Sequence, residues 1–472
     1  MKYISTRGGD GPIGFDDALL AGLARDGGLY LPQEWPQLSL DEWRALAGRP
    51  YIEVAAAIMA RFTDGEIDPE TMLAMTTETY AGFDHPDVAP LVPLEDNLHV
   101  LELFHGPTIA FKDYAMQFLS RAFDRALKAR GRRAVILGAT SGDTGSAALE
   151  AFQGRDFVDI FILFPDGRVS PIQQRQMTSV IADGAHAVAV EGDFDDCQDA
   201  VKALFRDLEF RDRIGLSAIN SINWARLMPQ IVYYATSALA LGAPDRAVAF
   251  SIPTGNFGNI FAGYAASRMG LPIKRLICAS NRNDILTRFF ASGAMERQAV
   301  EPSLSPSMDI QVSSNFERLL FELLDRNGEA VAAMMQHFAE TGRFDVAPDV
   351  LARAHELFSG FRLDDQGIVD QIRDIRKTHG MVLDPHSAVG VAAARDAIAR
   401  GEIEADTPVI ALACAHPAKF PDAVARATGT EPPLPPHLAD LMDRPERMDR
   451  VSHEPAAIAR LVEAGRRSPA DG

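Results

Sequence analysis

The residues best suited to covalent chemistry lie in the stretch HGPTIAFKD, residues 105–113, which places Lys112 shortly after a Gly-Pro turn. Apolar residues dominate the segments on both sides of this stretch. A lysine in partly apolar surroundings loses some of its preference for the ammonium form, and its free amine can then attack a carbonyl carbon. Because most lysines are solvated surface residues, this interpretation needs support from other parts of the chain.

A glycine turn suited to phosphate lies in PTGNFGN, residues 253–259, between a predicted strand and a predicted helix. Gly255 and Gly258 permit unusual φ angles and a close approach of the backbone. The start of the following helix offers unpaired N–H groups and the positive end of its dipole, which together attract an anion. An ordinary turn between a strand and a helix is the alternative. The turn matches neither GxxxxGK[ST] nor GxGxxG, so it does not indicate a nucleotide-binding loop.

A second turn between a strand and a helix, GATSGDTG at residues 138–145, is rich in hydroxyl groups. Thr140, Ser141 and Thr144 offer these hydroxyls beside the amides of a helix start, which suits a substrate carboxylate. The same hydroxyls could instead cap the helix, and the two roles can coexist.

A fourth segment, ACAHPAKF at residues 413–420, follows a predicted strand. Such strand ends line the crevice of open α/β sheets, where Cys414 or His416 could face a ligand. The alternative is that the cysteine is a small core residue. A candidate lysine nucleophile and a phosphate-binding turn in one α/β block are what an aldehyde cofactor with a phosphate group requires. Together they predict pyridoxal phosphate as the cofactor.

The composition is that of a soluble globular protein of 472 residues with a net charge of −19. This acidic balance argues against nucleic acid and anionic membranes as partners. The three cysteines, Cys197, Cys278 and Cys414, are far apart, which fits a reducing compartment and no disulfide framework. We identify no secretion signal and no apolar run long enough to span a bilayer, so we expect a cytoplasmic protein. No metal site is expected.

The apolar pattern divides the chain into four expected parts. Residues 1–95 are mainly helical, residues 96–245 and 246–430 alternate apolar strands with helices, and residues 431–472 form a tail rich in proline and charge. The second part carries the lysine and the hydroxyl-rich turn, and the third carries the glycine turn and a helical insertion. Continuous apolar strands separated by helices predict an α/β protein with parallel sheets covered on both faces. A long apolar helix is expected over residues 224–241.

With these segments assembled, the chain resembles the threonine synthase family of fold type II pyridoxal-phosphate enzymes, in its long bacterial and fungal branch. The resemblance extends in order over nearly the whole chain up to about residue 430. Its motifs are YISTRG at residues 3–8, DGGLYLP at 26–32, HGPTIAFKD, GATSGDTGSAA, PTGNFGN, MDIQVSSNFE at 308–317, LDPHSAVG at 383–390 and AHPAKF.

This resemblance implies two open, mostly parallel twisted sheets flanked by helices, with a mainly helical N-terminal region. It implies that Lys112 holds the cofactor through an imine, and that the loop from Ser141 through Asp143 to Thr144 faces the substrate carboxylate. The implied reaction converts O-phospho-L-homoserine and water into L-threonine and phosphate, the last step of threonine biosynthesis. The residues implied to cradle the cofactor phosphate are Gly255, Asn256, Phe257, Gly258 and Asn259.

Cys414 departs from the family pattern, because members commonly have threonine there, with its hydroxyl near the pyridine nitrogen of the cofactor. A thiol is a weaker hydrogen-bonding group than a hydroxyl. We hypothesise that Cys414 still takes this place, with less polarisation of the ring. The alternative is a shifted strand in which Cys414 is only a core residue.

Capture of the substrate phosphate needs a cation, and four residues are candidates: Arg226, Arg282, Lys419 and Arg7. Taken singly, each is more often a surface charge. Arg226 is preferred because it lies near an expected helix start.

Three alternatives of function stay open. A hydroxyamino-acid dehydratase or a phospholyase that releases a keto acid would use the same lysine and phosphate turn. A non-catalytic sensor of phosphorylated metabolites would use the glycine turns without a covalent bond to the cofactor. The sequence shows no self-complementary patch from which an oligomeric state could be read.

Overall fold

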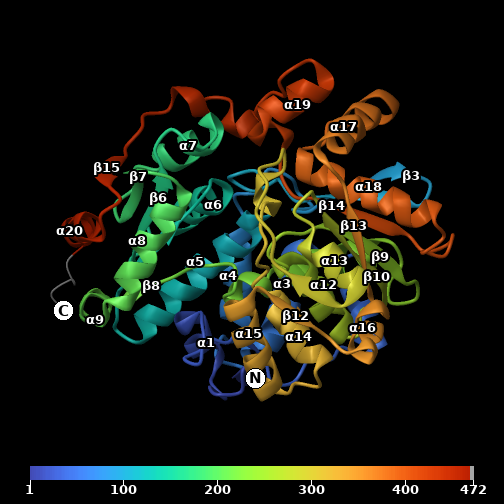
Figure 1. The fold of residues 1–472 in the computed structure, drawn as a ribbon, viewed down its shortest axis with the longest axis horizontal. Coiled ribbons are helices and arrows are strands. Elements are labelled where there is room, and N and C mark those ends of the chain that lie inside the picture. The colour runs from blue at the N-terminus through green and yellow to red at the C-terminus, as the bar shows by residue number, and fades with distance from the viewer. Residues whose placement is uncertain (468–472) are drawn as a thin grey trace.

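Two separate sheets form the frame of the protein, whose computed structural model describes residues 1–467 (Figure 1). The larger sheet has six strands in the order β13-β10-β9-β14-β4-β3, and its edge strand β3 runs antiparallel to β4 while the other neighbours are parallel. These strands are β3 (Leu91–Glu95), β4 (Leu98–Glu102), β9 (Val248–Pro253), β10 (Ile273–Ser280), β13 (Phe358–Arg362) and β14 (Val409–Ala413).

The smaller sheet has five parallel strands in the order β15-β7-β6-β5-β8. Every residue of its central strand β6, with the sequence VDIFILFP, is buried, as expected of a strand covered on both faces. The strands are β5 (Ala134–Ala139), β6 (Val158–Pro165), β7 (Ala185–Glu191), β8 (Leu216–Ser217) and β15 (Asp449–Ser452). Two small antiparallel pairs join β1 (Tyr3–Ser5) to β2 (Tyr30–Pro32) and β11 (Ala294–Glu296) to β12 (Arg343–Asp345).

Alternation along β9 shows how helices cover both faces of the larger sheet. Val248, Phe250 and Ile252 join the main core, whereas Ala249 packs in a second core with residues of α17 and α18. The helices of this half and of the linking segments are α10 (Trp224–Leu227), α11 (Gln230–Ala240), α12 (Gly258–Arg268), α13 (Ile285–Ser292), α14 (Phe316–Leu323), α15 (Gly328–Thr341), α16 (Pro348–His355), α17 (Asp365–His379), α18 (Pro385–Ala399) and α19 (Pro421–Thr428).

The smaller sheet is likewise flanked by helices, with Cys197, Ala200 and Leu204 of α8 packed against its strands. The N-terminal region is mainly helical and packs against α5 and α11. The remaining helices are α1 (Phe15–Ala21), α2 (Leu40–Leu46), α3 (Tyr51–Thr63), α4 (Pro69–Tyr80), α5 (Lys112–Ala129), α6 (Asp143–Phe152), α7 (Pro171–Thr178), α8 (Phe194–Arg206), α9 (Leu208–Ile214) and α20 (Pro455–Gly465). This architecture confirms the expected fold class.

The C-terminal segment joins the two halves of the molecule. After α19 the chain crosses over to the smaller sheet, where β15 pairs with β7 and α20 packs against α8 (Figure 1). The division into four parts stays a prediction. Each sheet takes strands from more than one of those parts, because β3 and β4 lie in the larger sheet and β15 lies in the smaller one.

Two local differences from the sequence expectations have simple causes. The expected helix over residues 224–241 is two helices, α10 and α11, with Pro229 at the N-cap of α11, where its missing N–H breaks the hydrogen-bond ladder. Strand β13, with the sequence FSGFR, was not expected, because its polar and half-buried residues lack the apolar run of its neighbours. None of the helices within residues 1–467 has the length and apolar character that a membrane crossing requires.

Arg318 ties the N-terminal region to α14 and is fully buried. Its Nη2 donates to the carbonyl of Tyr30 at 2.8 Å and to the carbonyl of Ile222 at 2.6 Å. Burial lowers the pKa of Arg318 to about 9. The buried charge is tolerated because these carbonyl oxygens take the place of water around the guanidinium.

We expect Arg318→Met to lower the free energy of unfolding by about 2–4 kcal/mol, because two buried carbonyls lose their donor. Denaturant titration of the variant checks this value. Arg353→Met is the control, since Arg353 pairs with the exposed Asp325 at 2.9 Å and exposed pairs contribute about 0–1 kcal/mol. Equal losses in the two variants would contradict the anchoring role of Arg318.

Candidate active site

Lys112 begins α5 and follows a loop that other segments hold in place. The loop is hydrogen-bonded to the segment after β14, with the N–H of Phe111 donating to the carbonyl of Cys414 at 2.8 Å and the N–H of His416 donating to the carbonyl of Ile109 at 3.0 Å. The side chain of Lys112 is 12% exposed, and its Nζ lies 4.9 Å from the centre of the Phe111 ring. The amine is therefore close to the interior and not in bulk solvent.

Asp113, the neighbour of Lys112, stabilises the turn before the helix. Its fully buried carboxylate accepts hydrogen bonds from the N–H and the hydroxyl of Thr108, at 2.8 and 2.6 Å. Burial raises the pKa of Asp113 to about 6, although these hydrogen bonds and the charge of Lys419 act in the opposite direction. Asp113 therefore stabilises the conformation of the loop. Within residues 1–467, the amine of Lys112 is hydrogen-bonded to Asp143 and not to Asp113.

Asp143 lies between two lysines. Its Oδ2 is 3.4 Å from Nζ of Lys112 and its Oδ1 is 3.1 Å from Nζ of Lys419, while Nε2 of Gln173 donates to Oδ1 at 2.9 Å. Burial alone would raise the pKa of the Asp143 carboxyl, but the charges of Lys419 and Lys112 bring it well below its usual range. Asp143 is therefore an anion, so its side chain is unsuited to bind a substrate carboxylate, and only its backbone N–H can do so.

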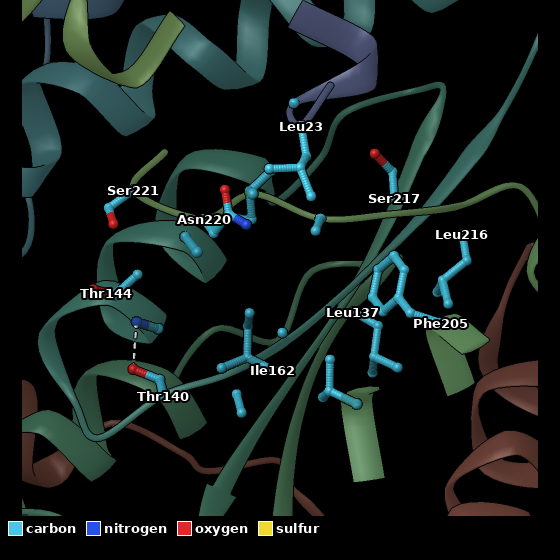
Figure 2. Close-up of a pocket in the computed structure, with 18 of the residues that line it drawn as sticks. Leu23, Leu137, Thr140, Thr144, Ile162, Phe205, Leu216, Ser217, Asn220 and Ser221 are labelled. Carbon is cyan, nitrogen blue, oxygen red and sulfur yellow. Dashed lines mark hydrogen bonds between the residues drawn. The ribbon is translucent and has the colours of Figure 1, made fainter. Parts of the chain in front are cut away.

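The hydroxyl-rich turn after β5 combines both roles that its sequence left open. The hydroxyl of Thr140 accepts from the N–H of Gly142 at 3.0 Å and from the N–H of Gly145 at 2.9 Å, so it shapes the turn from within. Figure 2 shows one hydrogen bond to Thr140, from Gly145, as a dashed line. Ser141 and Thr144 line a cavity, and the backbone N–H groups of residues 141, 143 and 144 donate no hydrogen bond within residues 1–467. The turn thus presents free donors at the start of α6, as an anionic ligand requires.

The glycine turn between β9 and α12 has the features of a phosphate cradle. Phe257 adopts a left-handed conformation with φ of 61°, and the N–H groups of residues 255–259 donate no hydrogen bond within the described chain. A Cβ on Gly255 would lie 2.8 Å from the carbonyl oxygen of Ser307, which is closer than packing allows. Both the free donors and the missing side chains at Gly255 and Gly258 fit the phosphate group of the expected cofactor.

The side chains of this turn pack against and hydrogen-bond to neighbouring parts of the protein. Phe257 is buried, with its ring 5.2 Å from that of Phe316. The amide of Asn256 is bonded to the side chain of Ser221 and to the N–H of Ser314. These contacts fix the shape of the cradle, so we assign its anion-binding capacity to the backbone.

Asn259 connects the cradle to Cys414. Its Oδ1 accepts from the hydroxyls of Tyr233 and Tyr234 at 2.7 and 2.9 Å, which turns its Nδ2 toward the sulfur of Cys414 at 3.9 Å. The thiol is buried, and burial, followed by the charge of Asp384, raises its pKa, so Cys414 is a neutral thiol. Cys414 therefore lies between the cradle and the loop that carries Lys112, which supports a place beside the cofactor over a place in a remote core.

A cavity of about 710 Å³ adjoins this cluster. Leu23, Leu137 and Phe205 contribute to its apolar part, and Thr140, Thr144 and Ser221 to its polar part (Figure 2). Lys112 and the cradle are not among the residues that line this cavity. It meets the cradle through Ser221, whose hydroxyl contacts Asn256, so the cavity is a chamber beside the cofactor region.

Arg226 lines the polar part of the cavity and differs from the other candidate cations. It is 5% exposed, its guanidinium forms no ion pair within residues 1–467, and its Nε has no hydrogen-bond partner. Burial lowers the pKa of Arg226 to about 10. The other three are paired, Arg7 with Glu317 at 2.9 Å, Arg282 with Asp365 at 2.9 Å and Lys419 with Asp143.

Several residues of the site escaped the sequence analysis. Ser307 donates to Oδ2 of Asp143 at 3.4 Å, and Tyr233 and Tyr234 orient Asn259. The pairing of Lys419 with Asp143 was also missed, although both residues lie in motifs that the resemblance includes. Nothing in the linear spacing shows which of several lysines and carboxylates become partners.

Comparison with known proteins identifies the family. Models described as "Threonine synthase N terminus", "Pyridoxal-phosphate dependent enzyme" and "Threonine synthase, C-terminal" match residues 2–80, 85–349 and 387–462. A threonine synthase from Pseudomonas aeruginosa is 51% identical over 98% of both chains, and one from Schizosaccharomyces pombe is 42% identical over 90% of this chain and 88% of the other. The chain belongs to the threonine synthase family.

Solved structures of the family have the same fold. A threonine synthase from Brucella melitensis with bound pyridoxal phosphate has a TM-score of 0.97 and 55% identity, covering 99% of this chain and 100% of the other. The yeast threonine synthase has a TM-score of 0.91 and 38% identity, covering 98% and 97%. These findings confirm the predicted family and its dependence on pyridoxal phosphate, while the individual site residues remain predictions.

Gly255→Ala tests the cradle. We expect the variant to lose most of its bound cofactor, because the new methyl group would collide with the backbone of Ser307 and open the turn. Absorbance of the bound cofactor after gel filtration measures the loss. Gly82→Ala is the control, since its Cβ would lie 3.8 Å from Pro107. Full cofactor content in Gly255→Ala would rule out a tight cradle at this turn.

Proposed function

We propose that this chain converts O-phospho-L-homoserine and water into L-threonine and phosphate. The observation that carries the proposal is Arg226, a buried arginine with no ion-pair partner within residues 1–467. It lines the same cavity as Ser141 and Thr144. A substrate with a carboxylate at one end and a phosphate at the other would satisfy both groups. Membership of the threonine synthase family supports the same reaction.

The cofactor would be held by three parts of the chain. Lys112 would bond to its aldehyde carbon, the backbone of residues 255–259 would bind its phosphate, and Cys414 would face its pyridine nitrogen. When bound, pyridoxal phosphate withdraws electrons from the substrate carbons and so makes proton removal there feasible.

Lys112 is the residue to which we assign the proton transfers. With the cofactor and substrate bound, the amine of Lys112 would accept the proton from Cα of the substrate, and it would have to give that proton up again before it could accept one from Cβ. Its attachment to the start of α5 keeps the amine close to both carbons. The 141–144 turn would fix the substrate carboxylate, and Arg226 would bind the phosphate until it leaves as an anion.

Product analysis separates this reaction from its alternatives. Incubation of the purified protein with O-phospho-L-homoserine should release phosphate and threonine in equal amounts. A phospholyase would give 2-oxobutyrate in place of threonine, and a dehydratase would give it from threonine. A non-catalytic sensor would give no product, and borohydride would leave the Lys112 side chain unmodified.

Arg226→Met tests phosphate capture. We expect kcat/KM for O-phospho-L-homoserine to fall about 10- to 100-fold, the usual effect of losing a hydrogen bond to a charged group. Steady-state kinetics with phosphate detection measures it. Lys202→Met is the control, because Lys202 lines the same cavity but pairs with the exposed Asp199 at 2.9 Å. Unchanged kinetics in Arg226→Met would exclude Arg226 from substrate binding.

Cys414→Thr tests the place of the thiol. We expect cofactor binding to persist and the absorbance of the bound cofactor to shift, because a hydroxyl is the stronger hydrogen-bonding group beside the ring nitrogen. Absorbance spectra of the purified variant decide this. Loss of the bound cofactor in Cys414→Thr would reject the hypothesis that position 414 faces the ring.

A further inference from the structure

Lys419 is a fully buried charged residue near the site. Its side chain has no exposed surface, and its Nζ donates to the carbonyl of Thr108 at 2.8 Å and to Oε1 of Gln176 at 2.9 Å. Its third partner is Oδ1 of Asp143, at 3.1 Å. Burying an ammonium group costs several kcal/mol unless partners replace water. The three partners of Lys419 are therefore needed to keep its charge in the interior.

The carboxylate of Asp143 is shared between two ammonium groups. Oδ1 faces Lys419 and Oδ2 faces Lys112, at 3.1 and 3.4 Å. If Lys112 is an ammonium, the three groups together carry one positive charge. If Lys112 is a neutral amine, Lys419 and Asp143 cancel and the cluster carries none. Because Lys419 already compensates the charge of Asp143, the carboxylate does not require an ammonium at Lys112.

Without Lys419 the balance would reverse. Lys112 would then be the cation beside Asp143, and the pair would be neutral only if Lys112 were an ammonium. An ammonium has no lone pair with which to attack an aldehyde or take a proton. The same aspartate that positions the lysine would therefore hold it in its inactive form.

We propose that Lys419 is a positioning residue whose buried charge neutralises Asp143 and so leaves Lys112 free to act as a neutral amine. The inference deepens the proposed function, since it concerns the residue to which that function assigns the proton transfers. Other titratable groups around the cluster are few and come from three elements. They are Asp113 of α5, the thiol of Cys414 after β14, and His386 at the start of α18, which is hydrogen-bonded to the buried Asp384 at 2.8 Å.

The test measures the amine directly and does not depend on turnover. The full-length chain, freed of cofactor, is treated with trace acetic anhydride over a range of pH, and acetylation of Lys112 is quantified by peptide mass spectrometry. Lys128, exposed at the far end of the same helix, is the internal reference. In Lys419→Met we expect the midpoint of Lys112 acetylation to move upward by about one to three pH units, the usual effect of an unopposed nearby carboxylate.

Two further variants separate charge balance from a structural role. Asp143→Asn removes the carboxylate and should move the midpoint downward. The double variant Lys419→Met/Asp143→Asn removes both charges and should return the midpoint close to the wild-type value, which a purely structural role of Lys419 would not produce. Circular dichroism confirms folding of each variant, and if Lys419→Met does not fold, Lys419→Gln, which removes the charge but keeps a polar donor group, takes its place in both the single and the double variant.

An unchanged midpoint in folded Lys419→Met, or a double variant that keeps the upward shift, would overturn the proposal. So would an unchanged midpoint in Asp143→Asn. None of these outcomes bears on whether the chain forms threonine, because product analysis of the wild-type enzyme tests that separately. Failure of the proposed function would in turn leave the acetylation midpoints as they are.

Discussion

The site depends on one constraint, which is that charges removed from water must be compensated by neighbouring groups. Asp143 and Lys419 form a compensated pair at 3.1 Å, and the second oxygen of the same carboxylate lies 3.4 Å from Nζ of Lys112. Arg318 is compensated by carbonyl oxygens. Arg226 is buried with no partner among the described residues. A buried cation that has no partner within residues 1–467 indicates where an anionic ligand belongs.

Strand topology brings these groups together from distant parts of the chain. β4, β14 and β9 are neighbours in the larger sheet, and the loops after their carboxyl ends carry the lysine loop, Cys414 and the phosphate cradle. The turn at the carboxyl end of β5 comes from the other sheet and brings Asp143 to Lys112. Carboxyl ends of parallel strands are where open α/β sheets bind ligands. The site thus lies where two such edges meet.

Much of this arrangement could be predicted from the sequence, since turns and strands have local causes. The glycine turn before α12 and the hydroxyl-rich turn before α6 follow buried apolar strands, and both turns have free amides as expected. Strand β13 could not be predicted, because its half-buried residues have no strong period. The break between α10 and α11 could have been predicted, because Pro229 indicates a helix boundary. The long apolar pattern was given more weight than this proline.

Which charged side chains form ion pairs with one another could not be predicted from the sequence in the same way. Arg226 and Lys419 are both buried, and both were candidates for the substrate phosphate. Their difference arises from the three-dimensional neighbours, because Asp143 reaches Lys419 across 276 residues of sequence and no acidic group reaches Arg226 among the described residues. A buried cation with a carboxylate partner neutralises the charge of that carboxylate. A buried cation without such a partner needs an anionic ligand to compensate its own charge. The same residue type therefore takes opposite roles within one site.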